Sequence, residues 1–179
     1  MAENNKPNGF PRPGSMFYNM AFNEKSKRRY IRLFRVFNKL VVPLYKLRIL
    51  PLIGLGRRLL VLTTKGRRSG KVRNNPLEYI RVNHKIYIFS AFGQKSDWFK
   101  NMCARPDEVY VQVGFRKFPA SFTVLEVTEQ NDILKWLAIK HPGYMKLGFG
   151  WNPNQDNPET VDFSSVAKIL KIISIQERM

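Results

Sequence analysis

Apolar residues recur along the chain at two different spacings, and the first of them predicts a helix. Between residues 30 and 45 they follow one helical face, at Tyr30, Leu33, Phe34, Phe37, Leu40, Val41, Leu44 and Tyr45. Basic residues fill the other faces, so we expect an amphipathic basic helix that Pro43 kinks or ends, because proline lacks a backbone donor. Such a stripe usually packs on the core, but the basic residues leave contact with a lipid surface open.

The pattern then changes to short segments rich in β-branched and aromatic residues, which are typical of strands. Two short helices, 98–104 and 132–141, interrupt them, and Thr128 is a plausible cap for the second. Closely connected strands favour a small, mostly antiparallel barrel over repeated βαβ units. We therefore expect an α+β fold with about six strands and an N-terminal amphipathic helix; the strands are 58–64, 76–82, 85–91, 109–113, 117–127 and, as the sixth, 166–175.

Residue types at two junctions indicate hairpin turns between these strands, at Asn83-His84 and Gly114-Phe115. The polar start, rich in Pro and Gly, predicts a flexible segment over residues 1–22, followed by one domain over 23–179. That start does not have the pattern of a signal peptide. With a single cysteine no internal disulfide can form, so we expect a cytoplasmic protein. Peripheral attachment to the inner face of the membrane stays open.

The positive charge of the chain is concentrated in one region. The net charge is +18, and the segment from Lys25 to Arg73 holds 16 of the 31 Lys and Arg residues and no Asp or Glu. Such a stretch repels itself unless an anionic partner binds there, which leaves a phosphate-rich cofactor, nucleic acid or anionic lipid. Aromatic residues are not interleaved with the basic ones as a base-stacking platform needs, so we expect no nucleic-acid partner.

Residues 66–73 form a loop suited to an anion. Gly66 and Gly70 can adopt positive φ and let backbone N–H groups converge, while the Arg and Lys side chains add charged donors. An ordinary exposed hairpin is the alternative reading of this loop. The loop is not a Walker A motif, because the glycines are too close and a strand follows. With two His, one Cys and no clustered carboxylates, we expect no metal site.

Two signatures resemble a known family. L-L-V-L-T-T-x-G-R-R-S-G-x-x-R-x-x-P-L begins at Leu59, S-A-F-G-x-K-S-D-W-F-x-N begins at Ser90, and N-M-C-A-R-P and V-x-V-Q-V-G-x-R-x-F-P-A follow. Over about residues 34–144 the chain resembles the deazaflavin-dependent nitroreductases, a family of split β-barrel oxidoreductases. The resemblance implies a site for coenzyme F-420, with FMN the less favoured cofactor. Hydride chemistry would then belong to the cofactor, which accounts for the missing catalytic clusters.

The resemblance also implies roles for particular residues. In that family the basic loop holds the phosphate and polyglutamate tail, and the segment after it lies along the deazaflavin ring. The end of the next strand and the short helix complete the pocket. The implied tail-binding residues are Arg67, Arg68, Ser69 and Arg73; those along the ring are Asn74, Asn75, Pro76 and Leu77; those completing the site are Ser90, Ala91, Lys95, Trp98 and Asn101.

On the substrate side the chain departs from the family pattern. The nitroreductases resemble one another in a late Y-P-x-Y-x-x-Y run and in a Tyr after P-L, whereas this chain has H-P-G-Y-M-K-L at 141–147 and Glu78 after Leu77. Tyr144 alone remains as a candidate proton donor to the substrate. We expect hydride transfer to a small, apolar acceptor that is quinone-like, nitro or unsaturated. The alternative is a non-catalytic barrel that binds a fatty acid or flavin-type ligand, and monomer and homodimer both stay open.

Overall fold

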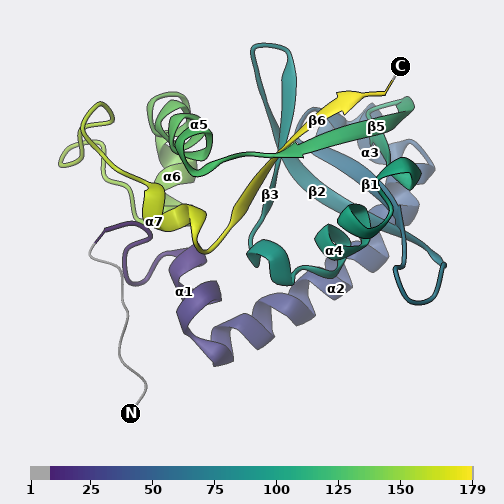
Figure 1. Ribbon diagram of the computed structural model, residues 1–179, viewed down its shortest axis with the longest axis horizontal. Coiled ribbons are helices and arrows are strands. Elements are labelled where there is room, and N and C mark those ends of the chain that lie inside the picture. Colours follow the sequence, from purple (N-terminus) through teal and green to yellow (C-terminus); the bar gives the residue numbers. More distant parts are fainter. Residues whose placement is uncertain (1–8, 179) are drawn as a thin grey trace.

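The computed structural model describes residues 9–178, and its centre is a closed barrel of six strands (Figure 1). The strand order around the barrel is β1-β2-β3-β6-β5-β4, every neighbouring pair is antiparallel, and β1 closes the barrel by pairing with β4. The predicted α+β fold with an antiparallel barrel of about six strands is confirmed. The strands are β1 (Leu59–Lys65), β2 (Val72–Val82), β3 (Lys85–Ser90), β4 (Tyr110–Val113), β5 (Arg116–Val124) and β6 (Lys171–Glu177).

Helices surround the barrel. The long helix α2 runs beside it, whereas α5, α6 and α7 gather at the other side of the view (Figure 1). Short 3-10 helices fill three connections: η1 (Leu55–Arg57), η2 (Gly93–Lys95) and η3 (Pro106–Glu108). The α-helices are α1 (Met16–Phe22), α2 (Glu24–Lys46), α3 (Ile49–Leu52), α4 (Asp97–Ala104), α5 (Val127–Lys140), α6 (Pro142–Phe149) and α7 (Ser164–Ala167).

Alternation along the strands divides the buried side chains between two clusters. On β2, Leu77 and Tyr79 belong to the cluster that fills the barrel, whereas Ile80 and Val82 pack on the cluster beneath the helices. Successive side chains of a strand point to opposite faces, so one strand serves both clusters. Fully buried members of the helical cluster include Leu134 of α5.

Both predicted hairpin turns are confirmed. Asn83 and His84 have φ of 47° and 66°, and Gly114 has φ of 58°. Two consecutive residues with positive φ match the right-handed twist of the strands that they join, and Asn tolerates this conformation better than most residues. The β2–β3 connection is therefore as short as the sequence indicates.

The N-terminal segment differs from the prediction of a flexible stretch over residues 1–22. Phe10, Phe17 and Met20 are buried in the helical cluster, and the ring of Phe17 stacks on Phe149 at 4.6 Å between centroids. Apolar residues spaced among polar ones give α1 a buried face once α6 lies beside it. The prediction is wrong for residues 9–22, and residues 1–8 lie outside the described part.

Several element boundaries differ from the prediction; β2, for example, begins at Val72 rather than at residue 76. Helix α5 begins five residues earlier than expected, and its cap is Glu126 rather than Thr128, because Glu126 and Glu129 form a reciprocal capping box. Helix α5 ends at Lys140, and Pro142 stands in the first turn of α6, where its missing N–H has no helical partner to lose. The last apolar run is likewise divided between α7 and β6.

Helix α2 keeps most of its apolar stripe on the surface. Val41 and Tyr45 are buried, but Leu33, Phe37 and Leu40 are 59%, 40% and 63% exposed, and the helix continues past Pro43 to Lys46. The expected core packing is therefore wrong for most of the stripe. Within residues 9–178, no helix is both long and apolar enough to span a bilayer.

A single tyrosine anchors the C-terminal end of α2 to the barrel. Tyr45 Oη donates a hydrogen bond to Leu59 O at 2.8 Å and accepts one from the backbone N–H of Gly114 at 2.8 Å. Its side chain is fully buried. The helix is thus fastened at one end to β1 and to the β4–β5 hairpin, while much of its length remains uncovered.

Candidate functional site

The basic loop between β1 and β2 is a compact turn closed by its own backbone. Gly66 N–H donates to Lys71 O at 2.9 Å, and Gly70 N–H donates to Gly66 O at 2.8 Å. Gly70 has φ of 64°, a conformation that disfavours residues with a Cβ. The Oγ of Ser69 accepts from Lys71 N–H at 3.4 Å, so that hydroxyl is used inside the loop.

Helix α4 holds this loop through Arg67. The backbone N–H and the guanidinium Nη1 of Arg67 both donate to Asn101 Oδ1, at 3.1 Å and 3.0 Å, and Nη2 donates to Asp97 Oδ1 at 3.1 Å. Asn101 is buried, whereas the Asp97 side chain is 84% exposed. The structure thus brings together two predicted site residues, Arg67 and Asn101, which hydrogen-bond to one another.

The remaining cations of the loop have no carboxylate partner in the part of the chain that the structure describes. Arg68, Lys71 and Arg73 are exposed, and no ion pair to them occurs among residues 9–178. Unpaired charges on one short turn attract anions, and a guanidinium can donate two parallel hydrogen bonds to a phosphate or carboxylate. The loop can therefore bind an anionic group without breaking an internal ion pair.

The predicted ring-binding segment lies on β2, where its residues alternate between two faces. Asn74 accepts a hydrogen bond from Thr63 Oγ1 at 2.9 Å, and Pro76 pairs with Val61 across the strands. Leu77 packs into the barrel instead. Because side chains alternate along a strand, Asn74 and Pro76 share the outer face, and Asn75 and Leu77 face the opposite way.

At the end of β3, Ser90 is a structural residue. Its fully buried Oγ donates to Gly93 O at 2.7 Å and lies 2.8 Å from Ser96 Oγ. The side chain therefore fixes the turn that leads into α4 and does not reach solvent. Ala91 next to it packs against the helical cluster, and Trp98 is half-buried against the cluster inside the barrel.

Lys95 lies toward the start of α2. The pKa of the Glu24 carboxyl is lowered, first by its hydrogen bond and ion pair with Lys27 and to a smaller extent by the charges of Arg28 and Lys95. Lys95 itself is exposed. Lys95, a predicted cofactor-binding residue, therefore lies between α2 and α4, the helix that holds the basic loop.

Tyr144 and Glu78 form a pair that sequence reasoning recognised only in part. Burial strongly raises the pKa of the Tyr144 hydroxyl, and the nearby Glu78 charge raises it further. Although Glu78 is exposed as a residue, desolvation raises the pKa of its carboxyl, against an opposing effect of Arg58. Glu78 shares the outer face of β2 with Asn74 and Pro76 by the alternation of the strand. In the sequence, the indication of this position was that Glu78 follows Leu77, where the resembling family has a tyrosine.

Among the described residues, no three His, Cys, Asp or Glu side chains are grouped as metal ligands. The arrangement instead combines a loop with exposed basic side chains, an outer strand face and a largely buried tyrosine, Tyr144. Such a site can hold a ligand with an anionic tail, present one side of it to a second molecule and supply a proton.

Comparison with known proteins places the chain in a family. Residues 51–148 match the model of a family described as F420H(2)-dependent quinone reductase, and this span contains all the predicted site residues. Among solved structures, the chain is similar to an F420-H2 dependent reductase, with 23% identity, a TM-score of 0.45, and coverage of 67% of this chain and 95% of the other. It is also similar to a pyridoxamine 5'-phosphate oxidase-related, FMN-binding protein from Nostoc punctiforme, with 11% identity, a TM-score of 0.44, and coverage of 71% and 74%.

Proposed function

The chain belongs to the family of F420H(2)-dependent quinone reductases, and from this premise we propose that it transfers a hydride from reduced coenzyme F-420 to a small, apolar acceptor. The protein is a deazaflavin-dependent oxidoreductase, and coenzyme F-420 is its cofactor. The proposed acceptor is a quinone or another apolar compound that accepts a hydride and a proton, such as a nitro or unsaturated compound. The observation that carries the proposal is the position of an anion-binding loop at the end of a strand whose outer face also bears Glu78, near Tyr144.

The loop fits the anionic end of this cofactor. Arg68, Lys71 and Arg73 would bind its phosphate and carboxylates, because none of the three is engaged in an ion pair among the described residues. Arg67 would act mainly by holding the loop on α4, since its donors are already directed at Asn101 and Asp97. Ser69 would contribute to the turn itself.

The ring system of the cofactor would lie along the outer face of β2. Asn74 is half-buried on that face, Pro76 on the same face is buried, and Ala91 follows at the end of β3. Asn75 and Leu77 point to the other side of the strand and would support this wall from behind. Ser90, Trp98 and Asn101 would position the elements around the site, and Lys95 would add positive charge at its edge.

When bound, the reduced deazaflavin supplies the hydride; the chain's own residues orient the two reactants and supply the proton. The Tyr144 hydroxyl is protonated at neutral pH, as in any tyrosine, and burial raises its pKa further. That hydroxyl can hydrogen-bond to the oxygen of an acceptor and deliver a proton to it as the hydride arrives. Glu78, whose pKa is also raised, lies near enough for its charge to influence Tyr144.

The test is a turnover assay with purified protein and reduced coenzyme F-420. We expect menadione, a small quinone, to reoxidise the cofactor in a protein-dependent reaction, and reduced FMN to replace the cofactor poorly. Nitroaromatic and unsaturated ketone acceptors assayed in parallel assign the acceptor class. If the cofactor binds and none of the acceptors is reduced, the chain is a binding protein and the proposal fails.

A second proposal concerns where an apolar acceptor is met. We propose that α2 and α3 rest on an anionic membrane surface, because exposed apolar side chains continue from Leu40 and Leu47 to Leu52, at 63%, 69% and 74% exposure. The surrounding segment from Lys25 to Arg73 has no acidic residue. Apolar side chains flanked by Lys and Arg are the composition of helices that lie in the membrane interface.

A further inference from the structure

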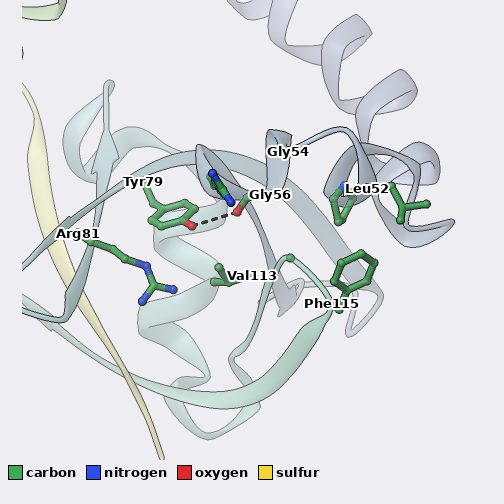
Figure 2. A pocket seen from close by; sticks show the side chains of 10 residues that line it. Leu52, Gly54, Gly56, Tyr79, Arg81, Val113 and Phe115 are labelled. Carbon is green, nitrogen blue, oxygen red and sulfur yellow. Dashed lines mark hydrogen bonds between the residues drawn. The ribbon is translucent and has the colours of Figure 1, made fainter.

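A hollow lies at the end of the barrel, apart from the proposed cofactor site. It is a cavity of about 540 Å³ between the α3–η1 segment and the β4–β5 hairpin (Figure 2). Arg57 at its wall precedes β1, whereas the basic loop follows β1. A strand of seven residues separates the two along the barrel by on the order of 20 Å. The cavity is therefore distinct from the anion-binding loop.

The two sides of this cavity differ in chemistry. Arg81 and Tyr79 lie on one side, and Leu52 and Phe115 lie on the opposite side, with Val113 between them (Figure 2). The Arg81 guanidinium lies over the ring of Tyr79, 5.7 Å from its centroid. A ligand that fills the cavity would therefore meet positive charge at one end and apolar surface at the other.

The wall on the charged side is rigid. Tyr79 is buried, and its Oη donates a hydrogen bond to Gly56 O at 3.0 Å, shown as the dashed line in Figure 2. A Cβ on Gly56 would lie 3.0 Å from the Cα of Gly114, so the glycine allows the η1 segment to approach the hairpin closely. The cavity is thus shaped by packed backbone.

The positive charge at this end of the barrel has no internal partner. Arg57 and Arg81 are exposed, form no ion pair within residues 9–178, and no Asp or Glu lines the cavity. Glu177 lines a neighbouring hollow of about 380 Å³ that shares Arg81, but this carboxylate is paired with Arg116 at 2.6 Å. An anion from outside the protein would therefore balance the positive charge at this end of the barrel.

We propose that the cavity binds an amphiphile with an anionic head group. A carboxylate or phosphate would lie between Arg57 and Arg81, and an alkyl chain would run past Val113 toward Leu52 and Phe115. The volume falls within the usual range for small-molecule sites, which combine mostly apolar walls with a few polar groups that fix orientation. This inference does not depend on the acceptor proposed above, and it shares one residue, Leu52, with the proposed membrane contact.

The experiment is a calorimetric titration of the cofactor-loaded protein with decanoate, below the concentration at which it forms micelles. We expect binding of one decanoate, weakened about tenfold or more by Arg57→Gln or Arg81→Gln, since each removes a charged hydrogen-bond donor. Decanol, with a comparable chain and no charge, should bind at least about tenfold more weakly. The control Lys168→Gln removes a distant exposed charge and should leave affinity unchanged.

A second variant tests the apolar end. Leu52→Glu changes a side chain that is 74% exposed, so folding should be preserved while the alkyl chain loses its contact and meets a like charge. Reduced affinity for decanoate supports the proposal. The proposal is overturned if decanol binds as well as decanoate, if the arginine variants bind like the wild type, or if decanoate displaces the cofactor instead of binding beside it.

Two further ligands identify the source of the head group. Decyl phosphate and dihexanoyl phosphatidic acid share a phosphate but differ in having one chain or two. Tighter binding of the phosphatidic acid would support a membrane lipid as the ligand, and tighter binding of decanoate or decyl phosphate would support a free single-chain amphiphile. Absence of binding by all three anionic compounds would refute the site.

Discussion

Arg67 and Asn101 are joined by two hydrogen bonds that end on the same oxygen. The backbone N–H and the guanidinium of Arg67 reach Asn101 Oδ1 at 3.1 Å and 3.0 Å, across 34 positions of sequence. Because Asn101 is buried on α4, these contacts attach the turn of the β1–β2 hairpin to a helix that is distant in sequence. The geometry of the basic loop therefore depends on a residue outside it.

Asn101→Ala should destabilise the protein and weaken cofactor binding together. Removal of the acceptor leaves a half-buried N–H without its partner, at a cost of about 1 to 3 kcal/mol in the free energy of unfolding. Urea denaturation measures that cost, and titration with coenzyme F-420 measures affinity. The matched change Asp97→Ala removes the other partner of Arg67, an exposed carboxylate, and should cost at most about 1 kcal/mol. Equal effects of the two changes would contradict this account.

Arg73→Ala and Arg67→Ala should have different effects on cofactor affinity and on thermal stability. Arg73 has no ion pair among the described residues, so its removal should weaken cofactor binding by about 1.5 to 3 kcal/mol per charged hydrogen bond while the melting temperature of the free protein stays unchanged. Arg67→Ala should lower both the affinity for the cofactor and the melting temperature of the free protein, because the donors of Arg67 hold the loop. Thermal melts without ligand, combined with cofactor titrations, separate these outcomes, and Lys168→Ala is the control. If Arg73→Ala leaves affinity intact, the loop is a structural hairpin.

Tyr144→Phe should slow the reaction without loss of cofactor binding. The change removes only the hydroxyl that we propose as proton donor, and general acid catalysis contributes about a hundredfold or more to a rate. Steady-state turnover with menadione and cofactor titration provide the two measurements. Tyr110→Phe, at an exposed position of β4, is the control and should have little effect. Unchanged turnover in Tyr144→Phe would make this residue a packing tyrosine.

Glu78→Gln should stabilise the protein at neutral pH and have no such effect in acid. The folded-state pKa of Glu78 is raised above its unfolded value by desolvation, so the folded state favours the protonated carboxyl. Its contribution to stability is fully present below the unfolded pKa, about 4.3, and is lost as pH rises through the folded pKa. Urea denaturation of wild type and variant between about pH 4 and 8 tests the sign. A variant that is less stable than the wild type at neutral pH would show that the charged form is favoured.

Helix α2 should bring the protein to anionic vesicles. We expect co-sedimentation with phosphatidylglycerol vesicles at low salt, none with phosphatidylcholine, and strong reduction at about 0.5 M salt, where charges are screened within a few ångströms. Leu40→Gln with Leu47→Gln should weaken binding without loss of stability, because both side chains are exposed. Lys168→Gln is the control for charge. Absence of binding to anionic vesicles at low salt would leave this face for another partner.

The pattern of neighbouring residues in the sequence was sufficient to predict the barrel and its turns. Alternating β-branched residues predict most strands to within a few residues, and Asn83-His84 predicts a hairpin because both features depend on neighbours in sequence. The composition of the loop 66–73 likewise predicts an anion site, and the paired signatures around it indicate the family. These inferences need no knowledge of which elements touch.

Only the tertiary structure decided which side chains are covered. The stripe on α2 has the spacing of a core face, yet Leu33 is exposed, because spacing says which residues share a face and not whether another element lies against it. The same reason explains Ser90, which the resemblance placed in the pocket and whose hydroxyl the fold directs at Gly93 and Ser96. The same reason explains why the sequence did not predict the hydrogen bonds between Arg67 and Asn101. Contacts between residues distant in sequence are set by how the whole chain packs, and no local pattern records them.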